Sequence, residues 1–160
     1  MAIQVGDRIP SGTLKVATPD GPKDVTTDEI FKGKKVVLFA VPGAFTPTCS
    51  AKHLPGYVQK AKDIKAKGVD AIVCLAVNDA FVMGAWGEAQ GVGDDVLMAA
   101  DGSAQFTKAL GLDFDAGKFG MGVRAQRFAA IVEDCVVKTL NVEQPMKFEV
   151  SDADSILKAL

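Results

Sequence analysis

The sequence has little excess charge of either sign and no long apolar run, and both absences exclude classes of partner. Its 160 residues carry 18 basic and 20 acidic side chains, a net charge of −2. Nucleic acids and anionic membranes bind clustered basic surfaces, so we expect neither as a partner. No stretch of about 18 apolar residues occurs, which argues against a membrane span. Residues 1–7 do not resemble a signal peptide, because they lack a basic start and an apolar segment. We therefore expect a cytoplasmic protein, with an organelle form whose transit peptide has been removed as the alternative.

Cysteine and histidine are scarce. The chain has three cysteines, Cys49, Cys74 and Cys135, and one histidine, His53. An odd number of cysteines argues against a disulfide framework. No group of Cys, His and Asp has the spacing of metal ligands, and the glycine-rich residues 117–122 do not follow a strand as a nucleotide-binding loop does. We therefore expect neither a metal nor a cofactor.

The order of apolar runs and helical patterns predicts one α/β domain over residues 1–160, with a mixed sheet flanked by helices. Apolar, β-branched residues at 35–41 and 69–77 predict buried strands, and Pro55 predicts that the helix between them is kinked or starts near that proline. Further expected elements are listed by residue: hairpins at 14–26 and 126–140, a strand at 96–99, helices at 78–90 and 104–110, and a helix at 152–160 capped by Ser151.

Cys49 is the cysteine whose surroundings favour chemistry over packing. It follows the strand 35–41 across a Pro42-Gly43 turn and opens a helix, where free N–H groups stabilise an anion. Thr46, one turn earlier, offers a hydroxyl to the thiolate or to an incoming oxygen. Thr46 stands where a CxxC site has its first cysteine. Cys49 therefore cannot form a disulfide within the motif, and dithiol–disulfide exchange of the CxxC kind is excluded. A single activated thiolate suits attack on an O–O bond instead.

Pro42, Thr46 and Cys49 together match the PxxxTxxC motif of peroxiredoxins. The longer segments PGAFTPTCSAKHLPGYV, LAVNDAFVMGAW and RAQRFAAIVEDCVVKTLNVE resemble the atypical, or type II, subfamily. The resemblance implies a thioredoxin-like fold, reduction of hydrogen peroxide and organic hydroperoxides, a homodimer and an active-site arginine. We assign that arginine to Arg127, directly before a predicted strand, and expect Arg124 to be a surface charge. Pro42 is expected to cover the site and limit water.

The thiol that regenerates Cys49 does not come from the position used by some family members. That region, residues 146–151, contains no cysteine. Cys74 matches a second cysteine of the family, but we interpret it as a core residue because it lies in an apolar strand; resolution by Cys74 is the alternative. Cys135 is interpreted as a buried residue at a turn. The expected reductant is therefore an external thiol, either glutaredoxin with glutathione or thioredoxin.

Two other functions compete with the peroxidase. A peroxide sensor would signal to a partner through the same oxidation of Cys49. A Cys–His hydrolase would use His53 as its base, which we disfavour because no orienting acid is evident. We interpret His53 as a residue at the rim of the site or on the face of the helix, and not as an essential one. Five apolar side chains are candidates for that rim and for a dimer interface: Phe45, Phe81, Trp86, Phe119 and Met121. For Phe81 we favour core packing.

Overall fold

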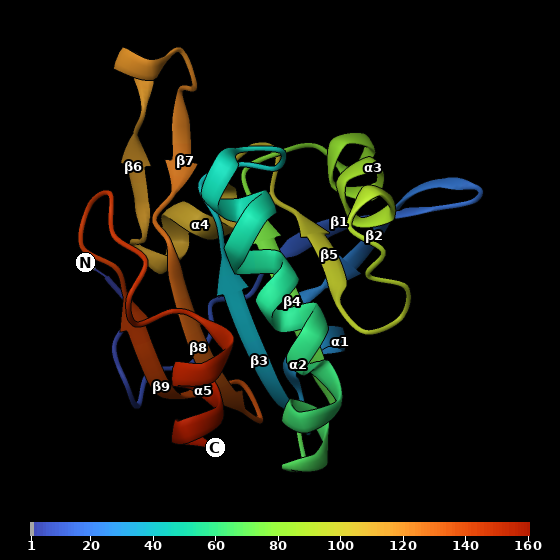
Figure 1. Cartoon of the computed structure of the whole chain (residues 1–160), viewed down its shortest axis with the longest axis vertical. Helices are drawn as coiled ribbons and strands as arrows, with labels where there is room; N and C mark the ends of the chain where they lie inside the picture. Colours follow the sequence, from blue (N-terminus) through green and yellow to red (C-terminus); the bar gives the residue numbers. More distant parts are fainter. Residues whose placement is uncertain (1) are drawn as a thin grey trace.

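A seven-stranded mixed sheet forms the centre of the computed structural model, which describes residues 2–160 (Figure 1). The strands run in the order β2-β1-β5-β4-β3-β8-β9. β3, β4 and β5 are parallel, and the other neighbouring pairs are antiparallel. The predicted mixed sheet is therefore confirmed. The strand bounds are β1 Thr13–Thr18, β2 Gly21–Thr26, β3 Lys35–Ala40, β4 Ala71–Ala76, β5 Leu97–Ala100, β8 Phe128–Glu133 and β9 Val136–Val142.

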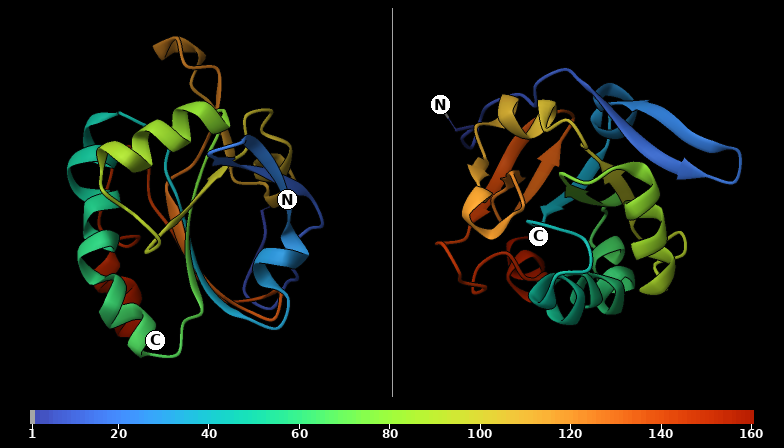
Figure 2. Two further views of the ribbon diagram at one scale, coloured as in Figure 1. Left: turned by 90° about the vertical axis from the view of Figure 1, so that its right-hand side faces the viewer. Right: turned by 90° about the horizontal axis from the view of Figure 1, so that it is seen from above.

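Helices cover both faces of this sheet (Figure 2). α2 (Leu54–Ala66), α3 (Ala80–Ala89) and α5 (Ala153–Ala159) pack on one face, and α1 (Thr27–Phe31) and α4 (Gln105–Leu110) pack on the other. Alternate residues of β3 enter the two cores: Val37 and Phe39 face the first set of helices, and Val36 and Leu38 face the second. A strand buried on both sides is apolar at every position, which explains the unbroken run at 36–41 that follows half-buried Lys35. No helix within residues 2–160 has the length and apolar character needed to cross a membrane.

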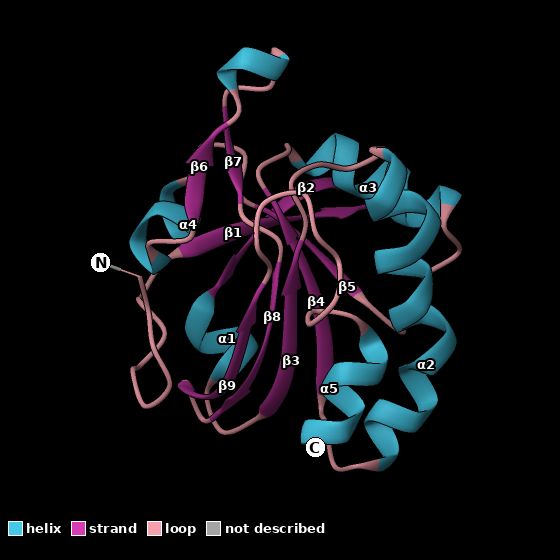
Figure 3. Cartoon of the chain, turned by 60° about the vertical axis from the view of Figure 1, so that its left-hand side comes forward, coloured by secondary structure: helices cyan, strands magenta, loops and turns pink. Residues whose placement is uncertain are grey.

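A second, two-stranded hairpin was not predicted. β6 (Asp113–Asp115) pairs with β7 (Val123–Ala125), and a short 3₁₀ turn at Gly117–Phe119 joins them. The hairpin projects from the body of the molecule (Figure 3). Strands of three residues are too short to show alternation in the sequence. Gly120 and Gly122 have φ angles of 72° and 68°, which glycine adopts without steric cost, so these glycines favour the tight turn.

The cap of the last helix differs from the prediction. Asp152, and not Ser151, precedes α5, and Ser155 donates to the Asp152 carboxylate. The Ser151 hydroxyl instead donates to Glu143 Oε2 at 2.7 Å. The Ser151 hydroxyl therefore binds the buried Glu143 carboxylate and does not provide the α5 cap that the sequence pattern predicts.

Candidate active site

Cys49 lies at the start of a single π-helical turn, Cys49–His53, which leads into α2. The Leu54 N–H donates to the Cys49 carbonyl, five residues back. Pro55 has no N–H with which to bond the Ala51 carbonyl, so a regular α-helix cannot extend through this turn. The regular helix begins at Leu54, as the position of Pro55 predicted. Such π-turns are frequent at functional sites.

The structure brings Arg127 to the sulfur of Cys49. Arg127 Nη2 donates to Cys49 Sγ at 3.1 Å, and the Cys49 side chain is completely buried. The sheet register explains the contact. Phe128, the first residue of β8, lies opposite Ala40, the last residue of β3. Arg127 therefore stands at the edge of the sheet from which the chain leads to Cys49.

His53 occupies the space next to Arg127 and is completely buried, so its expected position at the rim of the site is wrong. Its Nδ1 accepts a hydrogen bond from Arg127 Nη1 at 2.8 Å, and its Nε2 lies 3.1 Å from the Ser151 carbonyl oxygen. Burial, and then the charge of Arg127, lower the pKa of His53 to about 3. The only signal in the sequence was the spacing of four residues from Cys49, because Ser151 is 98 residues away.

Thr46 and Pro42 belong to the loop that precedes Cys49. The Thr46 hydroxyl donates to the Gly43 carbonyl at 2.7 Å and keeps free lone pairs. Arg124 is half-buried and donates to the carbonyls of Pro42 at 3.3 Å and Met121 at 2.9 Å. The expectation that Arg124 is a surface charge is therefore wrong, because Arg124 ties the β6–β7 hairpin to the active-site loop. A Cβ at position 43 would stand 2.9 Å from Arg124 Nη1, so a larger residue there would displace the guanidinium from its present position.

The other two cysteines are buried and, like Cys49, free. Cys74 lies in the middle of β4, where burial, and then the electrostatic interaction with Cys49, raise the pKa of its thiol well above the ordinary value. Cys135 follows β8 at its far end, whereas Arg127 precedes it. A strand of six residues spans about 20 Å, so Cys135 lies at the opposite end of the sheet from Cys49.

The apolar side chains near the site divide into exposed and buried ones. Phe45 and Phe119 are more than half exposed. Phe81 is 70% exposed, so core packing is the wrong interpretation for it. Trp86 is completely buried and donates from Nε1 to the hydroxyl of Ser50, at 3.0 Å, which makes it part of the support of the Cys49 turn and not of a rim.

Residues 2–160 contain no group of three His, Cys, Asp or Glu side chains that could hold a metal ion. A surface cavity of about 400 Å³ lies elsewhere and is lined by residues of β1, β2, β5, α3 and the N-terminus of α4. Phe81 lines this cavity, whereas Cys49, Thr46, Arg127 and Pro42 do not. The chemistry available at this end of the sheet is therefore that of a buried thiol, a guanidinium and a hydroxyl.

Comparison with known proteins agrees with this chemistry. The family model described as Redoxin matches residues 4–157. Chloroplastic peroxiredoxin-2E-2 of Oryza sativa subsp. japonica is 54% identical, over 99% of this chain and 72% of that protein. Peroxiredoxin-2B of Arabidopsis thaliana is 49% identical, over 99% of this chain and 98% of that protein. The crystal structure of reduced Prx3 from Vibrio vulnificus in complex with hydrogen peroxide is 57% identical, covers 98% of each chain and has a TM-score of 0.94. The chain therefore belongs to the type II peroxiredoxins and is a thiol-dependent peroxidase with a thioredoxin-like fold.

Proposed function

We propose that Cys49 is the thiolate that attacks the peroxide and that Arg127, Thr46 and Pro42 complete its site. The observation that carries this proposal is the contact of 3.1 Å between Arg127 Nη2 and the fully buried sulfur. A buried thiolate has lost its hydration and is costly without a charged donor. Arg127 supplies such a donor, and charge-assisted hydrogen bonds are the stronger kind.

The reaction transfers one oxygen atom to sulfur. The Cys49 thiolate attacks the terminal oxygen of ROOH, so the S–O bond forms as the O–O bond breaks. Cys49 is oxidised by two electrons to a sulfenic acid, and the leaving alkoxide or hydroxide takes up a proton to give ROH or water. Arg127 stabilises the charge that develops on the oxygens. The Thr46 hydroxyl, whose hydrogen is donated to the Gly43 carbonyl, accepts the O–H of the peroxide and orients it. Pro42, whose carbonyl is held by Arg124, limits the access of water.

The proposed substrates are hydrogen peroxide and organic hydroperoxides. Support for the first is the hydrogen peroxide bound to the similar Vibrio vulnificus protein. Support for the second is Phe45, whose 56% exposed ring lies on the active-site loop and offers an apolar surface to an organic group.

An external thiol, from glutaredoxin with glutathione or from thioredoxin, is proposed to regenerate Cys49. Burial and a raised pKa make Cys74 a poor nucleophile at neutral pH. Cys135 lies at the far end of the sheet, and residues 146–151 contain no cysteine. None of these positions offers the chain an accessible second thiol next to Cys49.

The test compares Cys49→Ser with Cys74→Ser. Peroxide consumption is measured with each reductant system, and the oxidised wild-type protein is analysed by mass spectrometry. We expect no turnover from Cys49→Ser and undiminished turnover from Cys74→Ser. Full turnover by Cys49→Ser would refute the assignment of Cys49, and a Cys49–Cys74 disulfide would refute external resolution. Stoichiometric oxidation of Cys49 without turnover by any reductant would indicate a sensor.

We also propose a homodimer and a cytoplasmic location. The exposed rings of Phe45 and Phe119, near the site and on the projecting hairpin, support a subunit interface. Light scattering on the wild type and on Phe119→Ser tests it, with a monomeric wild type as the contrary result. Three free cysteines fit a reducing compartment. The chloroplastic relative supports the organelle alternative.

A further inference from the structure

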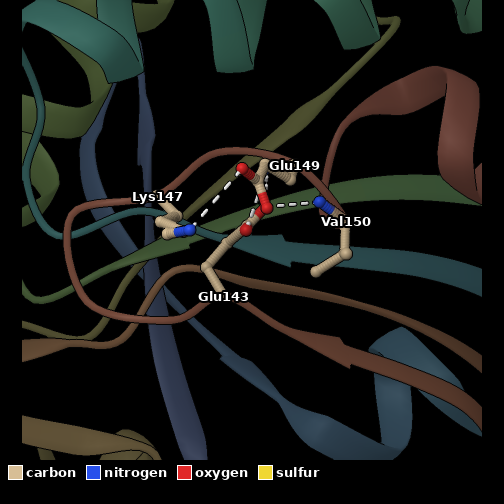
Figure 4. A network of polar contacts seen from close by, with 4 residues as sticks. All are labelled: Glu143, Lys147, Glu149 and Val150. Atoms are coloured by element: carbon tan, nitrogen blue, oxygen red, sulfur yellow. Dashed lines mark hydrogen bonds and ion pairs between the residues drawn. The ribbon is translucent and has the colours of Figure 1, made fainter.

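A buried carboxylate, Glu143, fixes the loop that follows β9. Its two oxygens accept the backbone N–H groups of Glu149 and Val150 at 2.9 Å (Figure 4). They also accept the backbone N–H of Ser151, at 2.8 Å, and the Ser151 hydroxyl, at 2.7 Å. The Glu143 side chain belongs to a residue only 8% exposed. Burial alone would raise the pKa of this carboxyl, but the hydrogen bonds from Ser151, Glu149 and Val150 prevail and lower it. Glu143 is therefore an anion that holds three consecutive amides in one position.

The loop that Glu143 holds contacts the site at two points. The Ser151 carbonyl faces His53 Nε2 and also accepts the Tyr57 hydroxyl at 2.7 Å. The ring of Phe148 lies 4.9 Å from the His53 ring, and the Arg127 guanidinium lies 5.7 Å from the centre of the same phenyl ring. His53 and Arg127 are thus covered by side chains and backbone whose placement depends on Glu143.

The hydrogen bonds of His53 determine which of its nitrogens carries the proton. The Ser151 carbonyl can only accept, so Nε2 must donate to it. Arg127 can only donate, so Nδ1 must be bare and accept. The ring is therefore neutral and directional. It binds Nη1 of the guanidinium and leaves Nη2 aimed at the sulfur of Cys49.

We propose that His53 and Glu143 are positioning residues for Arg127: His53 orients the guanidinium toward Cys49, and Glu143 fixes the loop that orients His53. The hydrogen bonds run without a break from the carboxylate to the sulfur, through Ser151, His53 and Arg127. A second link is the Glu143 backbone N–H, which donates to the Arg127 carbonyl at 2.9 Å. This inference rests on the proposed roles of Cys49 and Arg127.

Two substitutions of His53 separate its two nitrogens. His53→Asn places an amide oxygen near the position of Nδ1 and keeps an acceptor for Arg127. His53→Gln places its amide near Nε2 and keeps the contact with Ser151 but loses the acceptor. The readouts are the rate constant for oxidation of Cys49 by hydrogen peroxide in a single turnover and the pH profile of Cys49 alkylation by iodoacetamide. Both are measured per folded molecule, with the fluorescence of Trp86, the only tryptophan, as the check on folding.

We expect His53→Gln to oxidise about 10-fold more slowly and its alkylation profile to move to higher pH, since a misplaced guanidinium stabilises the thiolate less. The oxidation rate constant of His53→Asn should stay within about threefold of the wild-type value, because this variant keeps an acceptor for Arg127. Equal rates for both variants, whether high or low, would overturn the role of His53. A purely structural role would change stability and leave both readouts unmoved, which would also overturn it.

Glu143→Gln tests the end of the hydrogen-bond series that lies farthest from Cys49, and it does so even if a His53 variant does not fold. Its amide presents N–H groups to amides that also donate, so the loop shifts, and we expect slower oxidation and an alkylation profile at higher pH. Lys147→Gln is the matched control, because the exposed Lys147 side chain pairs with the Glu149 carboxylate at 3.9 Å, and this variant should match wild type. Wild-type rates for Glu143→Gln would overturn its positioning role. Cys49→Ser separates the two proposals: if it still consumes peroxide the proposed function fails, whatever the order of the other variants.

Discussion

Substitution of Arg127 by lysine tests whether peroxide reduction depends on the geometry of two donors or only on a positive charge. The guanidinium serves two partners at once, with Nη2 at 3.1 Å from Cys49 Sγ and Nη1 at 2.8 Å from His53 Nδ1. Lysine keeps the charge but presents it as a single ammonium on a flexible stem, without the rigid planar fork. A lysine at position 127 can therefore donate to Cys49 Sγ or to His53 Nδ1 in the native arrangement, but not to both.

The expected loss follows from one missing charge-assisted hydrogen bond. Such a bond contributes about 1.5–3 kcal/mol. Because about 1.4 kcal/mol corresponds to a factor of ten in rate, kcat/KM for hydrogen peroxide should fall roughly 10- to 150-fold. The loss should lie in the oxidation of Cys49 and not in its reduction, since Arg127 acts on the thiolate before the sulfenic acid forms.

The assay measures initial rates at low peroxide with excess reductant, beside thermal unfolding followed by circular dichroism. Arg8→Lys is the matched control, since Arg8 is exposed and pairs through its backbone with Val136, at the far end of β9. A value of kcat/KM for Arg127→Lys within threefold of wild type would refute the argument from two donors. An equal loss in Arg8→Lys would show that the effect is not specific to the site.

Three further predictions concern His53, Glu143 and Gly43. His53 has a pKa of about 3 when folded and 6.5 in its ordinary state, so the stability that depends on its neutral form is complete above pH 6.5 and is lost toward pH 3. Between pH 6.5 and pH 3, the free energy of unfolding of the wild type, measured in urea, should fall by about 1.4 kcal/mol per pH unit. His53→Asn should lack this fall, and equal slopes for the two proteins would contradict the prediction. The lowered pKa of Glu143 implies stability that is complete above its ordinary value of 4.5 and is lost as pH falls through the folded value. Glu143→Gln should therefore be less stable than wild type at pH 7 and converge with it in acid; a constant difference would contradict this. Gly43→Ala should lower kcat/KM several-fold by displacing Arg124, whereas Gly12→Ala, whose Cβ meets only Phe106 at 3.7 Å, should not.

The sequence by itself determined the strands of the seven-stranded sheet and the place of Cys49 after the central strand β3. Residues 36–41 are apolar at every position because the strand is covered on both faces, and this property can be recognised without knowing what covers it. Pro55 restricts the helix start through its own missing N–H, which is equally local. The selection of Arg127 over Arg124 depended on the motif and on the strand that follows it.

Only the tertiary structure decided the environment of these residues. Burial depends on what packs against a side chain, so His53, Arg124, Phe81 and Trp86 could not be assigned to the core or to the surface from their neighbours in sequence. The partner of His53 is 98 residues away, and a hydrogen bond across that separation leaves no periodic pattern. The same holds for Glu143, which resembles a surface acid in the sequence and is a buried anion in the fold. Its partners are backbone amides, which every residue except proline carries and which no sequence pattern can distinguish.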